Sequence, residues 1–371
     1  MSAVHLAERA TLGALLLADS PDTVREIVAW LRPEDFLDPW HRDVHKVIRD
    51  RAAAGQSVNP HAVGIGLLDR VGPTRAALVR LTDLLRATPT HPDPRSYALM
   101  VLEAALRREV ATLGVLLRAG ALSTALDGTA RPMLAVTATV DAGIEAIETR
   151  FGSASGVRAA DSEPRPIGRH PRIGPRPVVE HALAADRLLR AHPAPTRNQT
   201  GQLEAGLIAA LIARPHAIPA VRGWLRPDAL IERGWAAVYT AVLDLADQHR
   251  PVDPVTVAWH TRDTPAAPSP DVIAARVESA LPSDVGHLAR RVAADHLRHR
   301  SDEAARAFSA CAGDSTRALP EVLTLARAST ARLRTAAAPL TGGTSQPSRA
   351  PGVHGAPSRR PETTVPQGRA G

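Results

Sequence analysis

Apolar residues recur along the chain at intervals of three and four, the period of an amphipathic helix. The clearest case lies between residues 94 and 119, and we call it the apolar stripe. It consists of Leu99, Leu102, Leu106, Val110, Leu113 and Leu117. No segment shows a sustained strand-like alternation of apolar and polar residues. The pattern therefore predicts an all-α protein.

Strong helix-start signals support this prediction. A capping residue followed by proline favours a helix N-terminus, and it occurs at Ser20-Pro21, Asp38-Pro39, Asn59-Pro60, Asp93-Pro94 and Asp253-Pro254. The helices expected in the first half lie near 4–18, 21–31, 39–54, 60–70, 74–86, 94–119 and 132–150. Those expected in the second half lie near 201–213, 216–225, 235–248, 254–261, 270–280, 284–312 and 318–335.

The last two helices of the first half are long. At about 1.5 Å per residue, the longer would span on the order of 35–40 Å, more than a globule of about 90 residues needs. Gly55 and Gly120 follow two helical runs, where a left-handed C-cap is expected. We therefore expect a helical hairpin that projects from a small globule. Its apolar stripe is predicted to pack either against a partner or against the hairpin's other helix.

The chain also repeats itself. Trp30-Leu31-Arg32-Pro33 returns as Trp224-Leu225-Arg226-Pro227, and Val58-Asn59-Pro60 returns at the same offset of 194 as Val252-Asp253-Pro254. A duplicated unit of this length predicts two tandem domains. It also provides an internal control, because a residue that is essential to a chemistry is expected in both copies.

The repeat divides the chain into a first copy at 1–151, a linker at 152–200, a second copy at 201–335 and a tail at 336–371. Prolines and arginines alternate in the linker, so an extended form is expected there, interrupted by a helical patch near 178–191. The tail lacks periodic apolar residues and is expected to be disordered. Linker arginines are candidate nucleic-acid contacts, namely Arg165, Arg169, Arg172 and Arg176.

Composition leaves the source of the positive charge open. The chain of 371 residues carries a formal charge of +7, and Lys46 is its only lysine. A GC-rich coding bias and selection for phosphate contacts both give this excess of arginine. Cys311 is the only cysteine, which suits a reducing cytoplasm. The apolar run at 12–18 is far shorter than the ~20 residues of a membrane span, so we expect a cytoplasmic protein without membrane contact.

The first copy resembles the N-terminal domain of DnaB-type replicative helicases. The resemblance rests on Glu8 with the following Leu12–Leu16, then Leu31–Phe36, His41–His45 and Gly55–Pro60, and the second copy repeats it more weakly from Glu204. The resemblance extends into the expected hairpin of the second copy, where Val292 and Arg298 correspond to Val101 and Arg107. The family implies an all-α globule with a hairpin. In the helicase this domain pairs with its neighbours in a collar and docks primase.

The sequence contains no helicase motor. A phosphate loop needs glycines before a lysine that reaches the phosphates, and Lys46 lies without such glycines in an amphipathic pattern. We therefore expect neither intrinsic ATP-driven unwinding nor a bound cofactor.

Other candidate chemistry is weak. His41 and His45 have a metal-compatible spacing, but Trp235 and Tyr239 replace them in the second copy, so packing is expected and a metal site is not. His296 and His299 are expected to be solvated. Cys311 lacks a nucleophile motif.

Two further features bear on the expected role. The adjacent acids Glu34 and Asp35 are expected to favour a helix N-terminus. Trp30 and Trp224 are either core anchors or partner hot spots, with the core favoured. Together these observations predict a non-catalytic interaction protein of DNA replication, related to the primosome, that binds a replicative helicase, primase or itself. A DNA-binding accessory protein that uses the arginine-rich linker and tail is the alternative.

Overall fold

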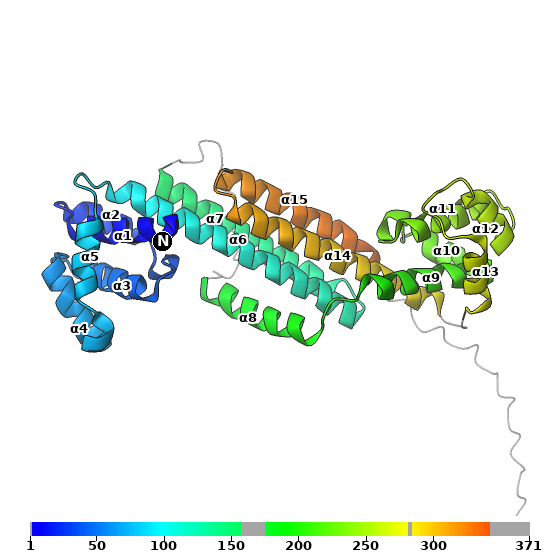
Figure 1. The fold of residues 1–371 in the computed structure, drawn as a ribbon, viewed down its shortest axis with the longest axis horizontal. Helices are drawn as coiled ribbons and strands as arrows, with labels where there is room; N and C mark the ends of the chain where they lie inside the picture. Colours follow the sequence, from blue (N-terminus) through cyan, green and yellow to red (C-terminus); the bar gives the residue numbers. More distant parts are fainter. Residues whose placement is uncertain (1, 157–174, 281–283, 342–371) are drawn as a thin grey trace, which may run out of the picture.

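The computed structural model describes residues 2–156, 175–280 and 284–341. All regular structure in these ranges is helical, as predicted. Two globules lie at opposite ends of an elongated molecule, and a bundle of long helices joins them (Figure 1). The two copies found in the sequence are therefore two globules, each with its own hairpin.

The first globule follows the predicted helices closely. Ser20, Asp38 and Asn59 cap their helices through side-chain oxygens, as expected, with the Trp40 amide 2.7 Å from Asp38 Oδ1. Gly55 has a φ of +66° and ends its helix, as predicted. Its elements are α1 (Ala3–Leu16), α2 (Pro21–Trp30), a short 3₁₀ turn η1 (Pro33–Asp35), α3 (Pro39–Ala53), α4 (Pro60–Ala76, kinked at Gly72) and α5 (Val79–Ala87).

The first hairpin is longer than predicted, and it consists of α6 (Pro94–Asp127) and α7 (Arg131–Ser155). The expectation that Gly120 ends the first of these helices is wrong. A Cβ at that position would lie 2.9 Å from Cβ of Val136 on α7, so this glycine allows the two helices to approach closely. Gly128, with a φ of +72°, ends α6 instead.

The second globule and hairpin repeat this order. Glu204 begins the matching pattern within α9, and Asp253 caps α12 as predicted. The elements are α9 (Arg197–Ala213), η2 (Pro215–Ala217), α10 (Ile218–Arg222), η3 (Pro227–Ala229), α11 (Arg233–Asp247), α12 (Pro254–Thr261), α13 (Pro270–Glu278), α14 (Val285–Gly313), α15 (Leu319–Ala337) and η4 (Ala338–Leu340).

The predicted helical patch of the linker is α8 (Pro175–Ala191), which starts three residues earlier than expected. This helix lies along α6 and buries Ala185 against the bundle. The predicted contacts Arg165, Arg169 and Arg172, and the tail from 342, lie outside the described residues. Arg176 falls in the first turn of α8.

The two hairpins pack side by side, so α6, α7, α14 and α15 form one four-helix bundle between the globules. Its core is built mainly from leucine, valine, isoleucine and alanine, with Met133 and Phe308 as exceptions. Among the described residues, α6 is the one helix whose length and hydropathy would allow it to cross a membrane, but 56% of that window is buried in the protein. The burial marks α6 as the core helix of the bundle.

Candidate interaction interface

The apolar stripe of α6 lies inside the bundle. Leu102, Leu106, Val110, Leu113 and Leu117 are each at most 1% exposed, and Leu99 packs partly buried against the same core. The sequence left open whether a partner or the hairpin's other helix covers this stripe. Both α7 and α14 pack on α6, so the stripe is covered by its own hairpin and by the hairpin of the second copy.

The two hairpins come into close contact at equivalent residues. The match of Val101 with Val292 sets an offset of 191 for these helices, and it pairs Gly114 with Ala305. These two positions touch, because a Cβ added to Gly114 would lie 3.1 Å from Cα of Ala305. Equivalent residues meet in this way where a two-fold axis relates two copies. The hairpins therefore pair as the two subunits of a symmetric dimer do, within one chain.

Polar contacts on either side of this point follow the same antiparallel arrangement. Arg118 of α6 donates from Nε to Asp302 of α14 over 2.6 Å. On the other pair of helices, Arg327 of α15 binds Glu148 of α7 with a distance of 3.0 Å from Nη1, and Arg334 binds Asp141. These side chains are partly exposed, so they fix the register of the bundle more than they stabilise it.

Arg107 makes the most buried polar contact between the hairpins. Its guanidinium donates to the carbonyl oxygens of Asp314, at 2.8 Å, and of Cys311 and Arg317. These carbonyls lie at the C-terminus of α14 and in the turn that follows, where unpaired acceptors and the negative end of the helix dipole favour a cation. Glu103 holds the same guanidinium from the other side at 2.7 Å. Arg107 therefore caps the hairpin of the other copy.

Each globule contains one buried glutamate that binds the start of a helix. Glu8 accepts hydrogen bonds from the amides of Leu37 and Asp38 and from His41 Nδ1 at 2.7 Å. Burial raises the pKa of Glu8, but these hydrogen bonds outweigh burial and leave it below its usual value. The glutamate fixes the turn between the globule's second and third helices.

The second copy keeps this contact without the histidine. Glu204 accepts from the amides of Ile231, at 2.6 Å, and Glu232, at 3.0 Å, and burial raises its pKa. Trp235 stands where the first copy has His41, and its ring makes no hydrogen bond to Glu204 within the described residues. The two acids that carry the family resemblance thus have a structural role, which their presence in both copies could have indicated.

The two histidines of α3 are buried, as the packing interpretation requires. His41 binds Glu8, and His45 packs its ring 4.9 Å from that of Phe36. Burial lowers the pKa of His45 to about 3. Within the described ranges, the residues whose ligand atoms approach one another as a metal site would are His5, Asp38 and His41. Asp38 is engaged there by helix capping and by Arg80 at 2.8 Å.

A buried ion cluster joins the first globule to its hairpin. Asp35 accepts from the Arg32 amide at 2.7 Å, consistent with a helix-start role, but it also receives Arg150 of α7 at 2.8 and 2.9 Å. Arg150 reaches Glu109 of α6 at 3.0 Å as well. Burial raises the pKa of both acids against the opposing charge of Arg150. Sequence reasoning missed this cluster.

The structure also places the other residues that the sequence analysis considered as possible site residues. The expectation that His296 is solvated is wrong, because its Nδ1 is buried without a partner among the described residues, whereas His299 is exposed. Trp30 and Trp224 lie at the edge of the core, partly buried. The carbonyl oxygen of Cys311 accepts a hydrogen bond from Arg107.

A family model described as the DnaB-like helicase N terminal domain matches residues 2–103 and 196–293. The two matched ranges cover both globules and the first part of each hairpin. No solved structure matches the chain.

Proposed function

Because the chain belongs to the DnaB-like helicase N-terminal domain family, we propose that it is a non-catalytic interaction protein of DNA replication. In this proposal its two family domains form a permanent pair. The observation that carries it is the contact of Gly114 with its equivalent Ala305. In an oligomer such a contact would join two subunits, and here it joins two halves of one chain.

The absence of a motor in the sequence supports a non-catalytic role. Lys46, the only lysine, lies in the middle of α3, where no glycine-rich loop precedes it. The matched ranges hold the family's N-terminal domain alone. The protein therefore acts by binding, and its partner is a replicative helicase, a primase or another copy of itself.

The hairpins cover each other's apolar faces, so we place the surface for that partner on the globules. In the second globule, Val255 and Trp259 are one helical turn apart on α12 and are 78% and 64% exposed. The Arg262 guanidinium lies 4.4 Å from the centre of the Trp259 ring. Aromatic and arginine side chains in such a group are frequent hot spots. The first globule has His61 and Ile65 at these positions, so we assign partner binding to the second globule.

Co-purification and size-exclusion chromatography with the replicative helicase and the primase of the same cell test the proposal. We expect a complex with one of them, or a defined self-assembly. Substitution of Trp259 by alanine should weaken it at least tenfold, and the same substitution of the half-buried Trp30 is the control for loss of an indole. A monomeric chain that binds neither protein would contradict the proposal.

DNA binding by the linker and tail is the second candidate function. It rests on their excess of arginine, which favours phosphate contacts. Deletion of 152–174 and 342–371 should then remove DNA binding, and the affinity of the intact chain should fall steeply with salt. Unchanged affinity after both deletions would contradict this function.

A further inference from the structure

A groove opens where the second globule meets its own hairpin. Its volume is about 680 Å³, which is in the range of small-molecule sites (about 300–1,000 Å³). The segment from 223 to 229 forms one wall, and α14 and α15 form the others. Its aromatic and charged lining residues are Trp224, Arg226, Asp228, His296, Arg300 and Arg332.

The corresponding place in the first module is filled with charged side chains. Asp35 and Glu109 of that module bind Arg150 there. At the offsets of the two matched segments, Ala229 replaces Asp35 and Arg300 replaces Glu109. The second module has therefore lost both acids of the cluster and gained a cation.

The arginine of the cluster is also lost. The helices α7 and α15 each carry proline at their second position, Pro132 and Pro320. Counted from these prolines, Arg150 corresponds to Ala338, which lines the groove. A side chain that fills the site in one copy is thus truncated to a methyl group in the other, and the groove is the space left open.

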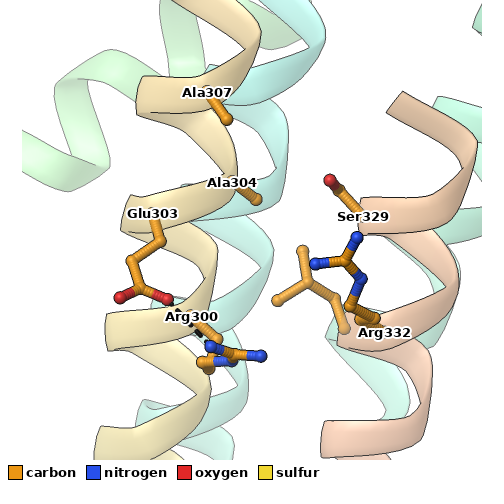
Figure 2. A pocket seen from close by; sticks show the side chains of 7 residues that line it. Arg300, Glu303, Ala304, Ala307, Ser329 and Arg332 are labelled. Atoms are coloured by element: carbon orange, nitrogen blue, oxygen red, sulfur yellow. Dashed lines mark hydrogen bonds and ion pairs between the residues drawn. The ribbon is translucent and has the colours of Figure 1, made fainter. Parts of the chain in front are cut away.

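The residues that line this space carry a net positive charge. The side chains of Arg226 and Arg332 have neither an ion pair nor a hydrogen bond within the part of the chain that the structure describes, and Arg300 is held by Glu303 at 3.1 Å. A smaller groove of about 140 Å³ adjoins the first and shares two of these arginines. Figure 2 shows Arg300 of α14 and Arg332 of α15 extending toward the space between their helices.

One lining residue has a buried polar atom without a partner in the described part of the chain. His296 lines the groove, and its Nδ1 has no hydrogen-bond partner among the described residues. A buried polar nitrogen without a partner is costly, which marks His296 as a residue whose environment is not fully satisfied by the protein. Asp228 is the acid among the residues that line the groove.

We propose that this groove binds a nucleoside diphosphate. Arginine guanidinium groups bind phosphate oxygens through paired hydrogen bonds, and Arg226, Arg300 and Arg332 supply three such groups. The ring of Trp224 lines the wall beside them, and its edge is fixed by a 2.8 Å hydrogen bond to the Ala220 carbonyl. An aromatic ring held in this way provides a stacking surface for a base. The inference goes beyond the pairing of the modules and does not depend on it.

Isothermal titration of the full chain with ADP, without magnesium, tests the proposal. We expect one site per chain. The substitutions Arg226→Glu and Arg332→Glu should each weaken binding at least tenfold. Arg306→Glu is the matched control, because Arg306 is exposed on α14 outside both grooves, and it should leave the affinity unchanged. Absence of ADP binding, or equal loss with Arg306→Glu, would overturn the proposal.

Further titrations identify the ligand. Inorganic pyrophosphate should bind at least tenfold more weakly than ADP, and equal affinity would contradict the contact with Trp224. A 20-nucleotide oligothymidine that binds through the same arginines while ADP does not would also overturn it. The triple substitution Ala229→Asp, Arg300→Glu and Ala338→Arg rebuilds the cluster of the first module. It should abolish ADP binding while the melting temperature is kept, which separates a filled groove from an unfolded protein.

Discussion

Gly114 and Ala305 occupy the same position in the two hairpins and lie in contact, with 3.1 Å from an added Cβ to the opposing Cα. Because the opposing atom belongs to the backbone, it cannot move aside as a flexible side chain would. The distance between α6 and α14 is therefore set by the absence of a side chain at one residue.

Substitution of Gly114 by leucine should drive the hairpins apart. Overpacking of a filled core typically costs about 1–3 kcal/mol, so we expect a loss of this size in the free energy of unfolding by urea. Gly206 of α9 has open space around its Cβ position, and Gly206→Leu serves as the control for the gain in helix propensity. An equal effect of the two substitutions would contradict a close contact at residue 114.

Removal of the buried carboxylate of Asp35 should destabilise the first module. The substitution Asp35→Ala leaves Arg150 buried with Glu109 alone, and the loss of one partner of a buried pair costs about 3–5 kcal/mol. Asp141→Ala, which breaks the exposed pair with Arg334, should cost less than about 1 kcal/mol. Thermal unfolding of both variants measures the difference, and similar melting temperatures would show that the cluster does not stabilise the fold.

His45 should make stability depend on pH. Its pKa is about 3 in the folded protein because of burial and about 6.5 when unfolded, so the unfolded chain binds more protons at intermediate pH. Stability therefore falls as pH falls from about 6.5 toward 3, by about 1.4 kcal/mol for each pH unit. Between pH 7.5 and 5.0 this contribution amounts to about 2 kcal/mol.

Tyrosine is the informative substitution at this position. Tyr239 stands there in the second copy and donates to the Leu225 carbonyl at 3.0 Å, so His45→Tyr should fit. The free energy of unfolding by urea should change between pH 7.5 and 5.0 by about 2 kcal/mol less in this variant than in the unaltered chain. The same substitution at the exposed His287 should leave the pH dependence of stability unchanged. An unaltered pH dependence in His45→Tyr would exclude His45 as its source.

Loss of the Arg107 guanidinium should loosen the end of α14. Hydrogen bonds from a charged donor contribute about 1.5–3 kcal/mol, and Arg107→Ala removes those to Asp314, Cys311 and Arg317. Amide hydrogen exchange should become faster at 311–319. The equivalent Arg298 makes one exposed contact with the Pro193 carbonyl at 3.2 Å, so Arg298→Ala should have a smaller effect. Equal protection in both variants would contradict the capping role.

Local sequence signals predicted most of the helices. Ser20, Asn59 and Asp93 cap the helices that their positions indicated, because capping depends on residues within one turn. The prediction that Gly120 ends a helix was wrong for a physical reason. Glycine ends helices through a positive φ, but it also lies where two helices meet closely, and neighbouring residues alone do not distinguish the two uses.

Contacts between distant segments were not predictable from pattern. Periodicity identified Leu106 and Val110 as a buried face, but it left open what covers that face. Asp35 and Arg150 are 115 residues apart, and no periodic signal connects them. The groove beside His296 could be recognised only once both copies were folded, because it follows from three substitutions on three different elements.

Pairing of the hairpins within one chain removes its dependence on protein concentration. Two separate domains dissociate when they are diluted below their dissociation constant, whereas tethered domains experience an effective concentration of the order of millimolar. The two modules of this protein therefore remain paired even where a cell holds only a few molecules. Any assembly built from the chain gains its modules two at a time.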